Sequence, residues 1–141
     1  MSVQDTVLIV EDHDLTRESY AEWLRAAGFK VIEATTKAVA LMHLDRLDLS
    51  AIVLDLILPN GHGREIVEAL KAKRDDVGVV VVSGFPDSPR FDLPVTSSLR
   101  KPFPRGVLLH AVVKAIETYT DPVKAIRAST RRLGNSHKKK N

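Results

Sequence analysis

Short apolar runs alternate along the chain with longer amphipathic stretches. The continuous runs are four to six residues long, and the run 79–82 consists of four valines, which favours a central strand. The longer stretches place apolar residues at helical spacing, as Tyr20, Trp23, Leu24 and Ala27 do. This alternation predicts a parallel sheet covered by helices on both sides. The predicted strands are 6–10, 31–32, 51–54, 79–82 and 97–100.

The helical stretches are bounded by glycine and proline. Gly28 follows the first stripe, as glycine commonly follows a helix C-terminus, and Pro104 stands at the first turn of the last helix. Residues 84–96 contain three prolines, so at most a short helix is expected there. The other predicted helix stripes are Ala40, Leu41, Leu44 and Leu47, then Ile66, Val67 and Leu70, and finally Leu109, Val112, Val113 and Ile116.

The order of these elements predicts one α/β domain over residues 1–120. A chain of 141 residues is long enough to bury a core of its own. Right-handed crossovers between parallel strands leave few topologies. We expect the flavodoxin-like (βα)5 arrangement, with five parallel strands in the order 2-1-3-4-5 and helices on both faces. The first and third strands are then neighbours.

Four of the five predicted strands end in polar residues. These residues are Glu11 and Asp12 after the first strand, Asp55 after the third, Ser83 after the fourth and Lys101 after the fifth. Ligands of open parallel sheets bind at the carboxyl ends of the strands. We therefore expect these five side chains to line one crevice.

Three carboxylates that meet in one crevice repel one another, by roughly 3 kcal/mol per pair at a separation of ~5 Å. A compensating cation is therefore expected. Oxygen ligands, without histidine or cysteine at ligand spacing, favour Mg²⁺, which binds one or two carboxylates together with water and phosphate oxygens. The chemistry that this indicates is phosphoryl transfer to a carboxylate, in which positioning and charge neutralisation dominate. Lys101 would supply a second positive charge, and Ser83 a hydroxyl for a phosphoryl oxygen.

Taken in order, these motifs resemble the response-regulator receiver domain of two-component signalling, over about residues 5–120. The resemblance implies that Asp55 is the phosphoacceptor and takes its phosphoryl group from the phosphohistidine of a sensor histidine kinase or phosphotransfer protein. It also implies that Glu11 and Asp12 hold Mg²⁺, together with Asp55 and the backbone carbonyl of Ile57. Such a domain is a signalling switch or a phosphorelay intermediate rather than an enzyme.

The resemblance extends to the ends of the last two strands. Ser83 is similar to the switch hydroxyl of the family, and Lys101 to its characteristic lysine, with a cis bond to Pro102 expected. Two features depart from the family pattern. Ser98 stands where many receivers carry tyrosine or phenylalanine, and the segment between Ser83 and Lys101 is short and rich in proline. The sequence therefore does not predict the aromatic switch that is common in receivers.

Two further expectations follow from the resemblance. Ile57 and Phe85 would flank the path of an attacking water, and apolar groups cannot orient water, so slow self-dephosphorylation is expected. The partner-facing surface is expected on the helix 4–strand 5–helix 5 face of the receiver, where Leu108 and Ala115 would add exposed apolar area. A homodimer through this face is a further expectation.

Other interpretations remain open at this point. One alternative on the residues alone is a receiver-like interaction scaffold that is never phosphorylated. Asp55 can cap a helix, as can Glu11 or Asp12, although Asp14 is nearer to that role. A phosphatase with an aspartyl phosphate intermediate is disfavoured because Ile57 stands where its second aspartate belongs, and a nucleotide-binding protein because no glycine-rich loop follows the first strand. His13 and His62 are expected at the surface.

Composition limits the chemistry and the cellular location that the chain can have. The chain has no cysteine, which excludes disulfides and thiol chemistry, and no apolar run approaches the ~20 residues that span a bilayer. Without a secretory signal pattern at the N-terminus, a cytoplasmic location is expected. Residues 121–141 carry a net charge of +6, against −3 for residues 1–120, and are expected to be a basic extension, partly helical and then disordered. Its length is too small for a helix-turn-helix domain, so direct DNA binding is not expected.

Overall fold

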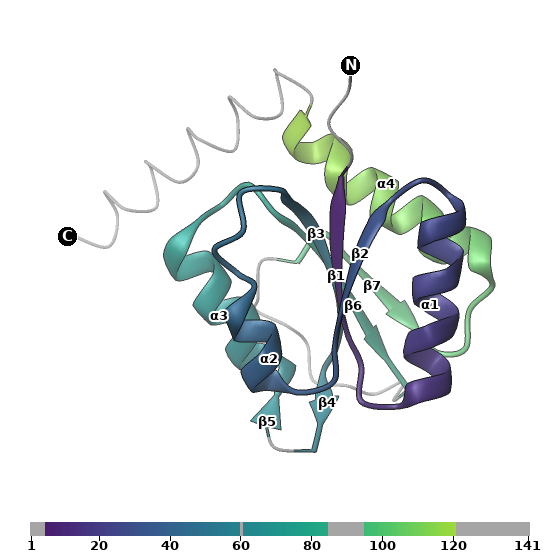
Figure 1. The fold of residues 1–141 in the computed structure, drawn as a ribbon, viewed down its shortest axis with the longest axis horizontal. Helices are drawn as coiled ribbons and strands as arrows, with labels where there is room; N and C mark the ends of the chain where they lie inside the picture. The colour runs from purple at the N-terminus through teal and green to yellow at the C-terminus, as the bar shows by residue number, and fades with distance from the viewer. Residues whose placement is uncertain (1–4, 60, 85–94, 121–141) are drawn as a thin grey trace.

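A computed structural model of the chain describes residues 5–59, 61–84 and 95–120. Within them, one parallel sheet has the strand order β2-β1-β3-β6-β7, which confirms the predicted order 2-1-3-4-5 (Figure 1). All four neighbouring pairs of this sheet are parallel. The strands are β1 (Thr6–Val10), β2 (Lys30–Ala34), β3 (Leu49–Asp55), β6 (Gly78–Ser83) and β7 (Ser97–Arg100).

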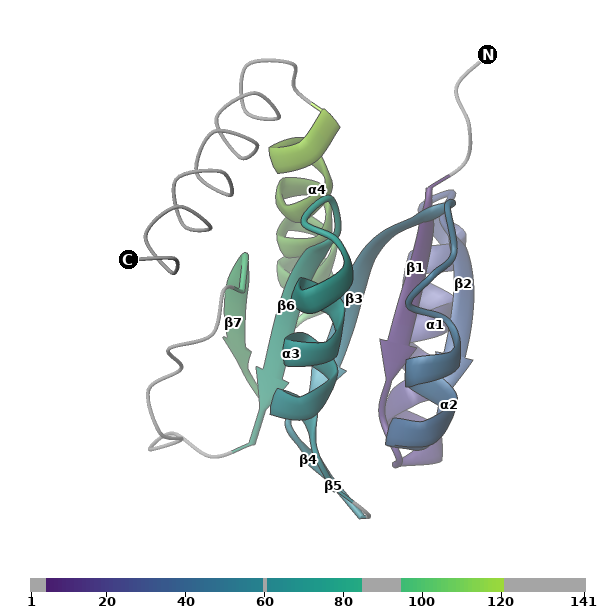
Figure 2. The same ribbon diagram turned by 90° about the vertical axis from the view of Figure 1, so that its left-hand side faces the viewer.

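Helices cover both faces of the sheet, as expected. Those on one face, α1 and α4, pack on a core that includes Leu24 and Leu108, and those on the other, α2 and α3, on a core that includes Leu44 and Ile66 (Figures 1 and 2). The sheet thus separates two buried layers of side chains. The helices are α1 (Asp14–Ala26), α2 (Lys37–Met42), α3 (Gly63–Lys73) and α4 (Arg105–Thr120).

The central strands explain why the sheet needs both layers. Every residue of β1 and β6 is buried, so their side chains must meet apolar groups on the two faces alike. Gly78, at the start of β6, lies against α4: a Cβ atom there would stand 2.6 Å from the Cβ of Ala115. At the end of α1, Gly28 has a φ of 99°, which favours glycine and turns the chain toward β2.

The face predicted for the last helix was wrong by one position. Leu108 and Ala115 are fully buried, whereas Val113, which was expected in the core, is 42% exposed. Val112 and Ile116 are buried as predicted. A stripe of apolar residues on this helix is broad enough to allow two phases, and contact with the valines of β6 and with β3 selects the one that faces inward. The exposed apolar residues of α4 are instead Val107 and Val113.

The second helix is shorter than its predicted stripe. It ends at Met42, and Leu47 lies beyond it with 96% of its surface exposed. Ala40 and Leu44 are buried as expected. The prediction included Leu47 because its spacing fits a helix. Spacing alone does not show whether a leucine lies in a helix or in the loop that follows it.

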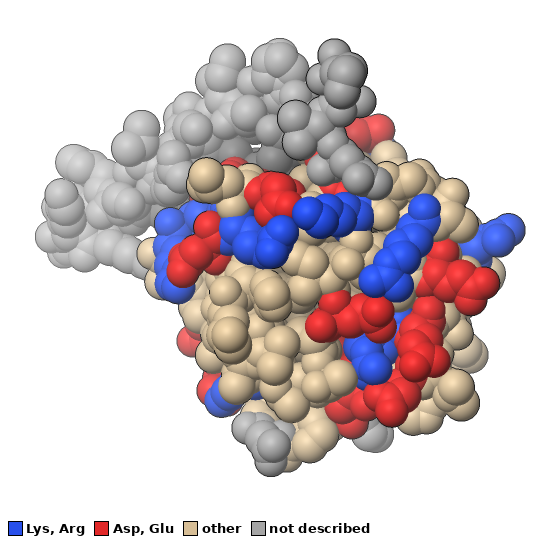
Figure 3. Space-filling model, viewed as in Figure 1, with Lys and Arg blue, Asp and Glu red and all other residues tan. Residues whose placement is uncertain are grey.

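Ion pairs and hydrogen bonds join side chains at the end of the sheet where the strands begin. Asp48, just before β3, accepts hydrogen bonds from Nε and Nη2 of Arg46, each at 3.0 Å, and from the Thr6 hydroxyl at 2.9 Å. Ser50 donates to Asp5 at 2.8 Å. On the face seen in Figure 3, basic and acidic side chains lie next to one another along this end. The hydrogen bonds from Arg46 and then Thr6 lower the pKa of Asp48 to about 2.

Three sequence predictions fall outside the described residues. They are the short helix within residues 84–96, the position of Phe85, and the partly helical extension 121–141. Within the described ranges, none of the helices is long and apolar enough to cross a membrane.

Candidate functional site

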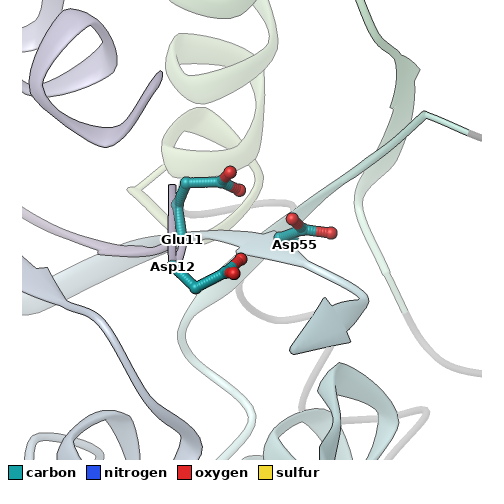
Figure 4. A group of neighbouring side chains, drawn as sticks. All are labelled: Glu11, Asp12 and Asp55. Carbon is teal, nitrogen blue, oxygen red and sulfur yellow. The ribbon is translucent and has the colours of Figure 1, made fainter. Parts of the chain in front are cut away.

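The predicted acidic residues meet at the carboxyl end of the sheet. Glu11 and Asp12 follow β1, Asp55 is the last residue of β3, and one carboxylate oxygen from each lies within 4.8 Å of the other two. Figure 4 shows the first two side chains leaving the end of β1 and Asp55 facing them from the neighbouring strand. Glu11 and Asp55 are buried, with 2% and 7% of their surface exposed, and Asp12 is open to solvent. The juxtaposition follows from the pairing of β1 with β3.

Lys101 reaches this cluster from the end of β7. Its ammonium contacts both carboxylate oxygens of Glu11, at 3.2 and 3.0 Å, and Oδ2 of Asp55 at 3.2 Å. The Lys101–Pro102 peptide bond is cis, which confirms the expectation from sequence. The backbone N–H of Lys101 donates to the carbonyl of Ser83 at 2.7 Å, so the ends of β6 and β7 are tied together at the site.

The electrostatics show that this ammonium does not balance the cluster. Burial, together with the hydrogen bond and the negative charge of Asp55, raises the pKa of Glu11 to about 7, although Lys101 acts in the opposite direction. Burial alone would lower the pKa of Lys101, but its bonds to Glu11 and the charge of Asp55 outweigh it and raise that pKa. In the described part of the chain, Lys101 contacts two of the three carboxylates, Glu11 and Asp55, and the cluster favours a further positive charge.

The second oxygen of Asp55 is held by the loop that follows. The backbone N–H of Ile57 donates to Oδ1 of Asp55 at 3.0 Å, and the Ile57 side chain is 52% exposed beside the site. Ile57 and Leu58 form β4, which pairs antiparallel with β5 (Gly61–His62). The sequence did not predict this small ladder. It fixes the loop between β3 and α3, and with it the orientation of the Asp55 carboxylate.

Ser83 and Ser98 lie where the sequence placed them. Asp55 is in register with Val82, so Ser83 stands one residue further along the neighbouring strand, and it is 6% exposed. Ser98, at the position discussed above for an aromatic residue, pairs with Val81 and has an exposed side chain. Ser83 is thus a buried residue at the end of the strand beside Asp55, whereas Ser98 is exposed on the edge strand.

The capping interpretations of the acidic residues are not supported. His13 is the N-cap of α1 and accepts a hydrogen bond from the Thr16 backbone N–H at 3.3 Å. His62 is the N-cap of α3 and accepts from the Arg64 N–H at 3.0 Å. Both helix starts beside the site are therefore capped by histidines, and Asp55 is left to the cluster.

Two supporting groups were missed by the sequence analysis. Arg17, 8% exposed, donates to the backbone carbonyl of Glu11, and the ring of Tyr20 stacks on Phe103 at 5.4 Å, two residues after Lys101. A signal for Arg17 was present: it lies three, four and seven residues before Tyr20, Ala21 and Leu24, so it belongs to the inward stripe of α1. A cation at such a position calls for buried acceptors.

Comparison with known proteins decides the family. The model of the response regulator receiver domain matches residues 7–113. The chain belongs to the response regulator receiver family. The acidic cluster of Glu11, Asp12 and Asp55 is consistent with the phosphoacceptor site of a receiver and typical of its Mg²⁺ site. A receiver is a signalling domain rather than a catalytic enzyme, and membership of the family implies a histidine kinase as partner.

Relatives of this receiver occur in proteins of different architecture. Response regulator RR06 of Streptococcus pneumoniae is 30% identical over 117 residues, covering 80% of this chain and 54% of that protein. A cyclic di-GMP phosphodiesterase of Thermotoga maritima is 40% identical over 83 residues, covering 59% of this chain and 22% of that protein. The chain thus spans about half or less of these curated relatives. A receiver structure from Methanospirillum hungatei shares the fold, with a TM-score of 0.78, 20% identity, and coverage of 84% of this chain and 98% of that one.

Proposed function

We propose that Asp55 accepts a phosphoryl group from a phosphohistidine in a Mg²⁺-dependent reaction, and that the chain acts as a signalling switch or a phosphorelay intermediate. The observation that carries the proposal is the contact of Lys101 with the two buried carboxylates of the acidic cluster: its ammonium lies 3.0 to 3.2 Å from oxygens of Glu11 and Asp55. In the transfer, a carboxylate oxygen of Asp55 attacks phosphorus as the P–N bond to the donor imidazole breaks. The released imidazole takes up a proton from solvent.

The donor set fits Mg²⁺. The acidic side chains offer hard oxygen ligands within 4.8 Å of one another. Burial, and then the hydrogen bond and charge of Asp55, raise the pKa of Glu11, and a divalent cation would favour its ionised form. We assign Glu11, Asp12, Asp55 and the backbone carbonyl of Ile57 as the protein groups that hold it. When bound, the ion supplies neutralisation of the charge that the phosphoryl group brings.

The remaining groups of the site position the phosphoryl oxygens. Lys101 already lies 3.2 Å from Asp55, so its ammonium can follow a phosphoryl oxygen with a small movement. The buried hydroxyl of Ser83, at the end of the adjacent strand, is assigned to a second oxygen. Both roles are electrostatic, as expected for a transfer in which positioning dominates.

The surface formed by β7 and α4 is proposed to face partners, including a second copy of the chain. A groove of about 580 Å³ lies between them, with Leu99, Val107 and Ala111 among its apolar lining and Lys114 at its polar side. Exposed apolar area comes from Val107 and Val113, each 42% exposed, and not from the residues first expected. Val107→Glu tests this assignment: it should abolish any dimer seen by sedimentation without preventing phosphorylation.

The test of the proposed function is intact-mass spectrometry after incubation with acetyl phosphate and Mg²⁺. We expect one phosphate adduct on the wild-type chain, lost in Asp55→Asn and lost when EDTA replaces Mg²⁺. Asp45→Asn, an exposed carboxylate paired with Lys73 on another surface, is the matched control and should retain the adduct. A folded wild-type protein that takes up no phosphate would contradict the proposal and favour the scaffold interpretation.

A further inference from the structure

Arg17 is a buried cation whose three guanidinium nitrogens all have acceptors. Nη1 donates to the backbone carbonyl of Glu11 at 3.1 Å, Nε donates to Oε1 of Glu33 at 3.2 Å, and Nη2 lies 2.9 Å from Oδ1 of Asp14. The guanidinium is planar and its donors have fixed directions, so three acceptors hold it in one orientation. Arg17 therefore joins β1, β2 and the first turn of α1 at a single point.

The contact of Arg17 with the carbonyl of Glu11 fixes the peptide group between Glu11 and Asp12. The N–H of Glu11 donates to the carbonyl of Ala34 at 3.1 Å, which continues the pairing of β1 with β2, and its carbonyl accepts from Arg17. Both peptide groups of Glu11 are thus fixed at the point where the chain leaves the sheet. Asp12 shares the peptide whose oxygen Arg17 holds, so the directions of both carboxylates depend on this contact.

We propose that Arg17 is a positioning residue for the acidic pair. By holding the carbonyl of Glu11 it directs the carboxylates of Glu11 and Asp12 toward Asp55, and so sets the affinity of the site for a divalent cation. This inference rests on the proposed function, since it concerns the same metal site. Arg17 itself contacts neither the metal nor the phosphoryl group; it acts through Glu11.

Because Arg17 is positively charged, removal of its charge and loss of its positioning role change the affinity for Mg²⁺ in opposite directions. Arg17→Met removes a positive charge close to an acidic site. Coulomb's law alone then requires Mg²⁺ to bind the variant more tightly. Loss of positioning requires the opposite, because partners that orient metal ligands are typically worth about 10- to 100-fold in affinity. The direction of the change therefore distinguishes the two effects.

Arg25 provides the matched control. It donates to the other oxygen of Glu33 at 3.2 Å and to the backbone carbonyl of Val31 at 3.4 Å, and its side chain is half-exposed. Arg25→Met removes the same charge from the same carboxylate and leaves the Glu11 carbonyl held. Its affinity for Mg²⁺ should stay within about twofold of wild type or rise slightly.

The experiment is a calorimetric titration of the full-length, unphosphorylated chain with MgCl₂. Arg17→Met should bind Mg²⁺ at least about 10-fold more weakly than wild type. Arg17→Lys is the second variant, in case the apolar one does not fold. It should also bind more weakly, because a compact ammonium lacks the planar fork with which the guanidinium reaches acceptors in three directions. In metal-free protein, the backbone carbonyl resonance of Glu11 should shift in both Arg17 variants and not in Arg25→Met.

Loss of stability is separated from loss of positioning by Val77→Ala, which opens a cavity in the core at the opposite end of the sheet. It should lower the melting temperature without changing the affinity for Mg²⁺. Wild-type affinity or tighter binding in the Arg17 variants would overturn the inference while leaving the proposed function intact, as would an equal loss of affinity in Val77→Ala. A wild-type chain that binds no Mg²⁺ would overturn both together.

Discussion

The carboxylates at the two ends of the same sheet have pKa values shifted in opposite directions. Where the strands begin, Asp48 receives two hydrogen bonds from Arg46 and one from Thr6, and these lower its pKa to about 2. Where the strands end, Glu11 and Asp55 share Lys101, and burial beside Asp55 raises the pKa of Glu11 to about 7. One end is neutralised by its own side chains; the other is left short of positive charge.

The carboxylates at the start of the strands are arranged for stability, and those at the end of the strands are not. A fold that needed only to be stable would give Glu11 the kind of partner that Asp48 has. Instead, parallel strands bring acidic residues together at one edge and the chain supplies one contacting ammonium among the described residues. An electrostatically unfavourable cluster of this kind is expected at a functional site, where bound ligands complete the charge balance.

The largest expected effect comes from removing that ammonium. Lys101→Met leaves Glu11 and Asp55 facing one another without the cation that contacts both. We expect the rate of phosphorylation by acetyl phosphate to fall by about 100-fold or more, since preorganised charge contributes on that scale. The measurement is the initial rate of adduct formation at saturating Mg²⁺. Lys114→Met, a lysine of α4 far from the acidic cluster in sequence and exposed to solvent, serves as control. A rate for Lys101→Met within a few-fold of this control would contradict the assignment.

Glu11→Gln sharpens the comparison by relieving the cluster. Burial and the neighbouring Asp55 raise the pKa of Glu11 from its ordinary value of 4.5 to about 7, so its contribution to stability is fully present below pH 4.5 and is lost as the pH rises through 7. At pH 8 without metal, the variant should therefore exceed wild type by about 2 kcal/mol in free energy of unfolding. At pH 4.5 the two should be nearly equal.

Urea unfolding in EDTA at the two pH values measures this difference. A constant difference between Glu11→Gln and wild type across this range would show that repulsion at the site is not its source. Added Mg²⁺ should reverse the order at pH 8, because it stabilises the wild type by binding the folded state and binds the variant more weakly.

Asp48→Asn should act in the opposite direction at the other end. The hydrogen bonds from Arg46 and Thr6 lower the pKa of Asp48 from its ordinary value of 3.8 to about 2, so its contribution to stability is present above pH 3.8 and is lost as the pH falls toward 2. Because the side chain is 31% exposed, we expect a loss of only about 0.5 to 1 kcal/mol at pH 7. Thermal unfolding at pH 7 and pH 2.5 tests this; a loss that does not shrink at the lower pH would refute the role of its charge.

The smallest expected effect concerns the lifetime of the phosphorylated state. Ile57 presents a half-exposed apolar side chain next to Asp55, and such a group cannot orient an attacking water. Ile57→Asn should accelerate self-dephosphorylation by about two- to fivefold, with little change in stability. The decay of the adduct, followed by intact mass after removal of acetyl phosphate, measures it. Ile57→Val is the apolar control, and equal decay of the two variants would contradict the prediction.

Much of the site could be predicted because its residues follow strands. The valines of β6 and the apolar runs of β1 and β3 have one stable arrangement, and the polar residues immediately after them must then lie at one edge of the sheet. Arg17 was not predicted, because its acceptors lie on three different elements that only come together in the fold. The phase of α4 was also missed, since Leu108 and Val113 are both apolar and only packing distinguishes them.

The order of the main strands and helices, the parallel sheet and the convergence of Glu11, Asp12, Asp55 and Lys101 could be read from the sequence, because local periodicity and right-handed crossovers leave little choice. The tertiary structure alone decided how these groups are held. It placed Lys101 between two carboxylates, and it set Arg17 against Glu33 and the carbonyl of Glu11. Those arrangements depend on burial and on contacts between residues distant in sequence, which a one-dimensional pattern does not contain.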